Sequence, residues 1–151
     1  MGSALRYRQL SPFVSHSMST LTTYLIPKLR THFPADSFRL GTAPDAVAVF
    51  PAIHPEFGDV EIIDDGDELT VVLGKFTHSH FNCYEDNLSE TDKSQKIVTE
   101  LIKFLQDVFS DQVVFYGTQG VGGGCFSKER KPPENIRSKC YVWSGPVQLN
   151  G

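Results

Sequence analysis

The first helical pattern of the chain lies near its N-terminus. Within residues 19–33, Leu21, Leu25 and Leu29 recur every four residues, which is the spacing of one face of an α-helix. Pro27 interrupts this stripe and has no amide hydrogen to donate to the preceding turn. The pattern therefore predicts a helix over 19–33 that is either kinked at Pro27 or begins late.

A longer helical pattern covers residues 89–109. Ser89, followed three residues later by Asp92, is typical of a capped helix start. The apolar positions that form its stripe are Ile97, Val98, Leu101, Ile102, Leu105 and Phe109. We expect an amphipathic helix that buries this stripe and exposes its lysines and acids.

Two segments between these helices have the pattern of β-strands. Residues 46–53 are apolar and rich in β-forming side chains, and Pro51 indicates an edge strand or an early end. Residues 59–76 predict a hairpin, because Asp-Gly within the turn 64–67 allows the positive φ of a tight connection. The expected cross-strand pairs are Ile62–Leu69 and Val60–Val71 on the core face with Leu73, and Ile63–Glu68 next to the turn.

Two further short strands are expected after the second helix, at residues 112–117 and 139–145. The resulting order, α-β-β-β-α-β-β, has no β-α-β alternation, so it predicts an α+β class with a mainly antiparallel sheet and helices packed on one face. Residues 19–151 are interpreted as a single domain. Residues 1–18 are interpreted as a disordered or over-called N-terminal extension, because Met18 precedes a sequence that reads like a natural start.

The charge of the chain is concentrated in its middle. Residues 45–111 have a net charge of −11, although the whole chain has only −4. Such a surface repels nucleic-acid phosphates and attracts a basic protein partner. The turn residues Asp64, Asp65 and Asp67 are the candidate contacts, and an acidic face that is merely solvated is the alternative.

No stretch of the sequence approaches the roughly 20 apolar residues of a membrane-spanning helix, and no secretory signal is recognisable. We therefore expect a cytoplasmic protein without a cofactor, in which Cys83, Cys125 and Cys140 are reduced. A Cys125–Cys140 bridge is an alternative. A nucleophilic Cys83 with His78 or His80 as its base is a second alternative, and the spacing neither requires nor forbids it.

The segment FTHSHFNCYED (76–86) contains two histidines, a cysteine and two acids, which are residue types that bind metals or take part in catalysis. Alternation along a strand would place His78 and His80 on one face. With His54 they would offer three imidazoles to a catalytic metal, as in a metal-dependent hydrolase. With Tyr84 and nearby acids they would instead line a binding pocket without metal. A strand end with solvent-facing histidines is the third interpretation.

The geometry of a continuous strand opposes the metal set. If the second strand of the hairpin simply continues, His78 lies roughly 20 Å past the hairpin partner near His54. Only a bulge or a bend would then bring the two histidines together.

A glycine-rich stretch occupies residues 117–126. Its glycines Gly122, Gly123 and Gly124 precede Lys128 and Arg130, and this combination could hold a small anion. No GK[ST] sequence follows. A mobile hairpin loop, or a close approach of two backbones, is the alternative.

Several phrases of the sequence resemble a group of small, uncharacterised bacterial proteins: FPAIHPEFGDVEIIDDGDELTVVLGKFTHSHF, the helix start SETDK, the glycine run and the closing WSGP. The resemblance covers residues 19–146. It implies a single-domain cytoplasmic protein and transfers no activity to any residue.

The functional prediction is a non-enzymatic protein-binding module, in its sharpest form an immunity-like or accessory protein. The alternatives are a metal-dependent hydrolase that uses His54, His78 and His80, and an anion binder at the glycine-rich stretch. The oligomeric state is left open.

Overall fold

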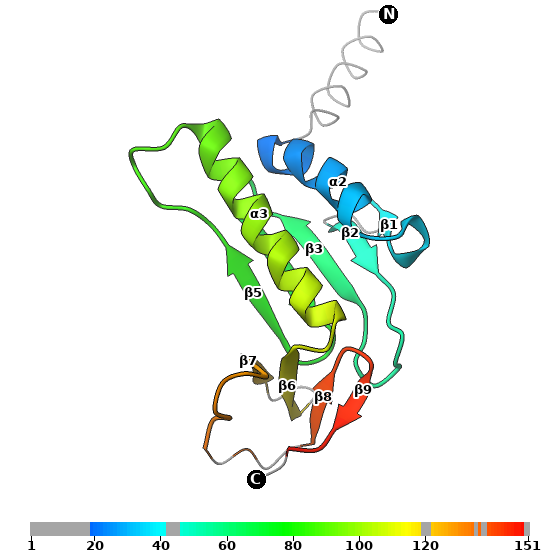
Figure 1. Ribbon diagram of the computed structural model, residues 1–151. Helices are drawn as coiled ribbons and strands as arrows, with labels where there is room; N and C mark the ends of the chain where they lie inside the picture. The colour runs from blue at the N-terminus through cyan, green and yellow to red at the C-terminus, as the bar shows by residue number, and fades with distance from the viewer. Residues whose placement is uncertain (1–18, 42–45, 119–121, 135, 137–138, 150–151) are drawn as a thin grey trace, which may run out of the picture.

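The computed structural model describes residues 19–41, 46–118, 122–134, 136 and 139–149, and it has an α+β fold (Figure 1). Its elements are α2 (Thr20–His32), the short 3-10 helix η1 (Ala35–Ser37), β1 (Arg39–Leu40), β2 (Ala46–Phe50), β3 (Val60–Asp64), β4 (Leu69–Leu73), β5 (Thr77–Phe81), α3 (Glu90–Phe109), β6 (Val113–Thr118), β7 (Gly122–Ser127), β8 (Cys140–Val142) and β9 (Gly145–Val147). The predicted class is confirmed.

Helix α2 forms where the leucine stripe predicts it. The Ser19 side chain caps its start by accepting a hydrogen bond from the Thr22 amide at 3.1 Å. The three predicted leucines are buried, and Pro27 lies inside the helix on its exposed side. The helix therefore begins well before Pro27, and the expectation of a late start is wrong. It ends before Pro34, as predicted.

Helix α3 follows its predicted pattern from the cap onward. Ser89 Oγ accepts a hydrogen bond from the Asp92 amide at 3.1 Å. The predicted stripe is buried except for Phe109, which is half-buried, while its neighbour Val108 is fully enclosed. The amphipathic pattern was therefore sufficient to orient the helix.

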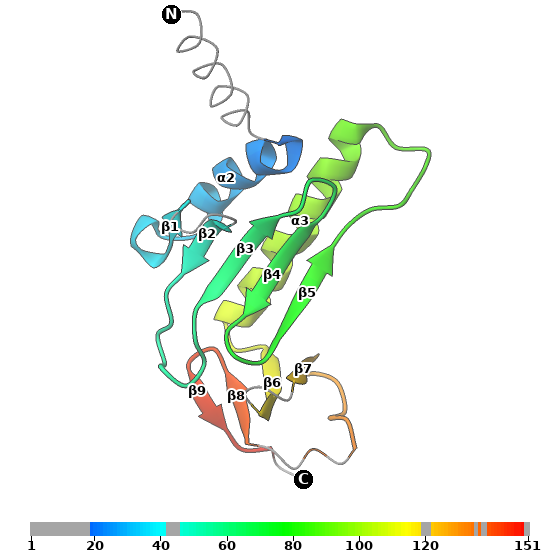
Figure 2. The ribbon, with the colours of Figure 1, turned by 180° about the vertical axis from the view of Figure 1, so that it is seen from behind.

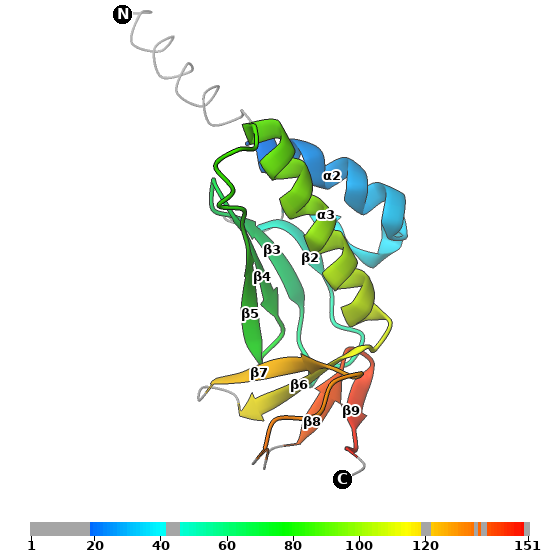
Figure 3. The same ribbon diagram turned by 60° about the vertical axis from the view of Figure 1, so that its left-hand side comes forward.

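The first sheet is an antiparallel meander with the order β1-β2-β3-β4-β5. Both helices lie against one of its faces, here called the inner face, and the outer face carries no described helix (Figure 3). The fully enclosed side chains of β3 and β4 on the inner face are Val60, Ile62, Leu69, Val71 and Leu73. The short strand β1 was not predicted, and because it pairs with β2, β2 is not an edge.

The β3–β4 hairpin has a register different from the predicted one. Asp64 lies opposite Leu69. Ile62 lies opposite Val71 and not opposite Leu69, so the register is shifted by two residues from the predicted one. The turn comprises residues 65–68, closed by a hydrogen bond from the Asp65 amide to the Glu68 carbonyl at 2.9 Å. A shift by an even number of residues keeps every side chain on its face of the sheet, so the predicted side chains still face the core.

Strand β5 corrects the expected continuation of the hairpin. The chain does not run straight on after Leu73; it reverses through Gly74, whose φ is +57°, and returns as β5 beside β4. A side chain at residue 74 would meet the Phe57 carbonyl oxygen at 2.0 Å, so only glycine fits this turn. The estimate that His78 lies far beyond the hairpin is therefore wrong, because His78 pairs with Val72.

The second sheet has the order β7-β6-β8-β9 and lies across one end of the first (Figure 1, Figure 2). The predicted final strand is in fact a hairpin, β8–β9. Phe57 packs its ring against Phe115 at 4.9 Å and against Trp143 at 5.3 Å between centroids. One hydrophobic cluster thus contains residues of both sheets and both helices. Among the described residues, neither α2 nor α3 is long and apolar enough to cross a bilayer.

Candidate functional site

The outer face of the first sheet carries both histidines of the segment 76–86. His78 and His80 alternate along β5 on the side opposite Leu73, as predicted, and both are exposed. Their rings meet edge to face with centroids 5.0 Å apart. Their placement resulted from the reversal at Gly74, which puts His80 directly opposite Thr70 of β4.

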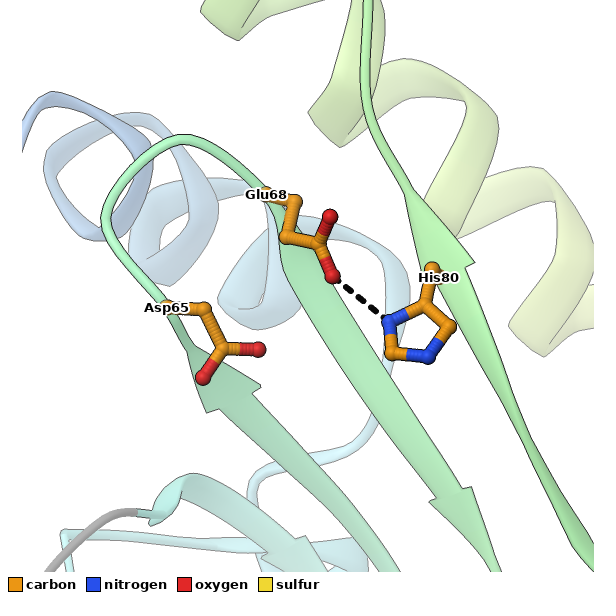
Figure 4. A group of neighbouring side chains, drawn as sticks. All are labelled: Asp65, Glu68 and His80. Carbon is orange, nitrogen blue, oxygen red and sulfur yellow. Dashed lines mark hydrogen bonds and ion pairs between the residues drawn. The ribbon is translucent and has the colours of Figure 1, made fainter.

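His80 joins two acids of the β3–β4 turn in a polar cluster (Figure 4). Its Nδ1 lies 2.6 Å from Glu68 Oε2 and 3.0 Å from Thr70 Oγ1. The Thr70 hydroxyl donates to Asp65 Oδ2 at 2.6 Å. One ligand-type atom from each of Asp65, Glu68 and His80 lies within 4.8 Å of the other two. We call these three residues the turn cluster.

The hydrogen bonds of the turn cluster fix the roles of its atoms. An ionised carboxylate only accepts, so His80 Nδ1 carries the proton toward Glu68. Thr70 is only 8% exposed, and its hydroxyl proton is committed to Asp65. The carboxylate of Asp65 is therefore oriented by a buried hydroxyl, and the imidazole of His80 is oriented by Glu68.

His54 does not belong to this cluster. It lies in the connection after β2, where its Nδ1 accepts a hydrogen bond from the Glu56 amide at 3.1 Å. Its ring is 6.5 Å from that of Tyr141 between centroids, and a Cβ at residue 145 would meet the His54 ring at 3.0 Å. Within the described residues, the group close enough to share a metal ion contains His80 but neither His54 nor His78. The predicted three-histidine set is not assembled.

Asp64 has a structural role that the sequence did not reveal. Its Oδ2 accepts hydrogen bonds from the hydroxyls of Ser19 and Thr22, the latter at 2.5 Å. Its Oδ1 accepts from the Gly66 amide at 2.8 Å. The carboxylate thus fastens the hairpin turn to the start of α2. Of the three predicted binding acids, Asp64 and Asp65 already accept hydrogen bonds within the fold, Asp65 from the Thr70 hydroxyl.

Asp67, Asp86 and Tyr84 belong to a cleft of about 400 Å³ next to this turn. The cleft is bounded by the start of α2, the β3–β4 turn, the segment 82–89 and the first turns of α3. Within the described residues, neither Asp67 nor Asp86 has an ion pair or a side-chain hydrogen bond. Tyr84 is 78% exposed. These elements meet at the end of the molecule away from the second sheet, here called the acidic end (Figure 2).

The two lysines of the acidic end already have acidic partners. Lys96 forms an ion pair with Glu85, and this hydrogen bond raises the pKa of Lys96 above its ordinary value. Lys93 lies 3.8 Å from Glu90 one turn away on α3. Among the described residues neither lysine forms an ion pair with Asp67 or Asp86, although Lys93 lines the same cleft.

The cysteines are separate thiols. Cys125 on β7 and Cys140 on β8 lie on opposite sides of β6, about two strand spacings or 10 Å apart, so the alternative of a bridge is wrong. Burial raises the pKa of both thiols, which disfavours the nucleophilic thiolate. Within the described chain, no hydrogen bond joins Cys83 to either neighbouring histidine.

The three consecutive glycines belong to a strand, while residues 119–121, where a hairpin loop would lie, are outside the described part of the chain. Gly122, Gly123 and Gly124 begin β7, and the Gly123–Gly124 backbone passes against Tyr116 of β6. A side chain at Gly123 would meet the Tyr116 carbonyl oxygen at 2.0 Å, which is the close approach that the sequence left as an alternative. The backbone of these glycines pairs with β6 and does not form the cradle of converging amides that the anion-binding alternative would need.

Lys128 and Arg130 both line a separate cleft of about 290 Å³ beyond β7. Both side chains are exposed, and the rest of the lining includes Phe126 and Leu149. Binding of an anion by these two residues stays a prediction.

A second polar contact lies where the two sheets meet. The Tyr141 hydroxyl donates to Glu56 Oε2 at 2.6 Å. This hydrogen bond lowers the pKa of Glu56, with a smaller contribution from the nearby charge of Lys139, and it raises the pKa of Tyr141. The hydrogen bond between Tyr141 and Glu56 joins the segment after β2 to β8. His54 lies beside this pair, and its Nδ1 bonds only the Glu56 amide among the described residues.

Sequence reasoning missed three residues that shape these sites. Glu68 and Thr70 were assigned to the hairpin alone, because the return of β5 beside β4 was not foreseen. The signal was available: Gly74-Lys75 after an apolar strand is typical of a hairpin turn. Asp86 became a site residue only through the cleft, which no local pattern encodes.

Comparison with known proteins identifies no relative of this chain. No family model matches the chain, and neither a curated protein nor a solved structure matches it. The resemblance to small bacterial proteins therefore stays a prediction, and the case for function must be made from the residues themselves.

Proposed function

We propose that this chain is a non-enzymatic protein-binding module whose acidic end receives a basic segment of a partner protein. The observation that carries the proposal is a pair of carboxylates, Asp67 and Asp86, that have no ion pair within the described residues and lie on one cleft beside the exposed ring of Tyr84. A lysine or arginine side chain of the partner is the group that this combination fits best.

The cleft offers a cation two kinds of attraction. Each carboxylate can accept charge-assisted hydrogen bonds from an ammonium or guanidinium group, and arginine can engage a carboxylate in a bidentate manner. The Tyr84 ring can add a cation–π contact worth about 0.5–1 kcal/mol at an exposed site. A volume of about 400 Å³ leaves room for one long side chain with part of its backbone.

The surroundings of the cleft favour a charged partner over a neutral one. Residues 45–111, which include the β3–β4 turn and the start of α3, have a net charge of −11, and long-range attraction of this kind speeds association with a basic protein. An immunity-like or accessory role in the cytoplasm is the sharpest form of the proposal. It rests on charge and on the site, since no catalytic set is assembled from the predicted histidines.

Selection from a random peptide library displayed against the immobilised protein tests the proposal without knowledge of the partner. We expect the recovered peptides to be enriched in arginine and lysine, and their binding to weaken steeply as salt is raised. Asp67→Lys with Asp86→Lys should reduce their affinity by at least tenfold, and Tyr84→Ala should reduce it less.

Asp107→Lys is the matched control, because it makes the same charge reversal on an exposed position at the other end of α3. Asp64 is left unchanged in all variants, since its loss would disturb α2 rather than the cleft. Recovery of acidic or neutral peptides would refute the proposal. So would an affinity that falls equally in the Asp107→Lys control.

A further inference from the structure

We propose that the turn cluster, Asp65, Glu68 and His80, binds a divalent transition-metal ion, with zinc as the reference ion. The site is distinct from the three-histidine set predicted from the sequence, and it does not depend on the protein-binding function. It lies on the outer face of the first sheet, where the β3–β4 turn meets β5 (Figure 4).

The cluster has three ligand atoms of the right chemical type. Two carboxylate oxygens and one imidazole nitrogen form a mixed oxygen–nitrogen set, which suits zinc and its neighbours better than calcium or magnesium. Calcium needs six to eight oxygen ligands, and magnesium strongly prefers an octahedral oxygen shell. Three protein ligands on an exposed face would leave a fourth position for water.

The distances allow coordination with small movements. Ligand bonds of about 2.0–2.2 Å to zinc place neighbouring ligand atoms about 3.4 Å apart in a tetrahedral shell. His80 Nδ1 and Glu68 Oε2 now lie 2.6 Å apart and would separate by about 0.8 Å. The Asp65 oxygen, within 4.8 Å of both, would approach by about 1.4 Å at most. Rotations of exposed side chains supply shifts of this size.

The ligands of the turn cluster are held by rigid neighbours. Thr70 is buried in β4, which lies between β3 and β5, and its hydroxyl donates to Asp65 while lying 3.0 Å from His80 Nδ1. Partners of this kind around a metal site orient its ligands and sustain their affinity. His80 itself lies in the ladder opposite Thr70, so its backbone is fixed by the sheet.

Binding would move one proton within the His80 ring. His80 Nδ1 now carries the proton that it donates to Glu68, so coordination through Nδ1 requires the neutral ring to carry its proton on Nε2 instead. Protons compete with the metal ion for the ligand atoms, so metal uptake is expected to weaken as the pH falls.

Titration of the full chain, without an affinity tag, with Zn²⁺ by calorimetry and with Co²⁺ by absorption tests the proposal. We expect one ion per chain, with a d–d spectrum of a low-coordinate Co²⁺ site. His80→Ala and Glu68→Gln should each lower the affinity by at least tenfold. Thr70→Val should lower it by about tenfold through loss of ligand orientation.

Three variants keep the result specific: His78→Ala on the same face, Asp67→Asn on the same turn, and His54→Ala near the second sheet. Each should leave affinity unchanged, and circular dichroism confirms that every variant is folded. Absence of stoichiometric uptake overturns the proposal. So does uptake that survives His80→Ala and Glu68→Gln, or uptake that disappears with His54→Ala. Peptide binding at the acidic cleft is measured separately, so failure of either proposal leaves the other testable.

Discussion

The two faces of the first sheet are built from the same strands and have opposite characters. On the inner face, Val60, Ile62, Val71 and other apolar side chains are fully enclosed by α2 and α3. On the outer face, the alternate positions hold Thr70 of β4 and the two exposed histidines of β5. Successive side chains of a strand point to opposite faces, so one strand supplies apolar side chains to the core and polar side chains to the candidate site.

This difference decides what could be predicted. The inner face follows from a local pattern of the sequence. Although the β3–β4 register is shifted by two residues from the predicted one, the predicted side chains are still buried. The outer face depends on which strands become neighbours. His80, Glu68 and Asp65 are brought together by the reversal at Gly74, and a straight continuation of β4 would have separated them.

The helices show the same division. Their stripes and the Ser89 cap were read correctly from spacing, because capping and amphipathicity are properties of neighbouring residues. The role of Asp64 was not, because its partners Ser19 and Thr22 lie more than forty positions away in the chain. The predicted binding acids of one turn therefore proved to be structural at Asp64 and unpaired at Asp67.

The largest effect is expected from the inner side. Leu101→Ala removes a fully enclosed side chain of α3 and should lower the free energy of unfolding by about 2–5 kcal/mol. His78→Ala, on the exposed outer face, should change it by less than about 0.5 kcal/mol. Urea denaturation of both variants measures the contrast. A similar loss in the two would show that the outer face is part of the stabilising structure.

An intermediate effect is expected where a polar residue acts as structure. Asp64→Asn weakens the acceptor of two hydroxyl groups at the start of α2 and should cost about 1–3 kcal/mol. Asp67→Asn, three residues along the same turn, serves as the control and should be nearly neutral. Thermal unfolding measures both. Equal stability of the two variants would contradict the assigned role of Asp64.

The smallest effect is expected at the contact between Tyr141 and Glu56, and it should depend on pH. The hydrogen bond lowers the pKa of Glu56 below its ordinary 4.5, so its stabilisation is present above pH 4.5 and is lost as the pH falls through the folded pKa. The pKa of Tyr141 is raised, so the same contact is also lost as the pH rises well beyond 10.

Urea denaturation of Tyr141→Phe and the parent chain across this range tests the contact. The variant should be less stable near neutral pH, and its deficit should shrink toward acidic and strongly alkaline pH. A deficit that is constant with pH would mean that the hydroxyl contributes by packing alone.

The order of the strands has a consequence for how the chain folds. In the first sheet every strand pairs with its neighbour in sequence, so each hairpin can form with a short loop closure. In the second sheet β6 lies between β7 and β8, and β8 must find its place after the twelve residues 128–139 that follow β7. We therefore expect the meander and its two helices to nucleate folding, with the terminal strands β8 and β9 docking last onto a surface that already exists.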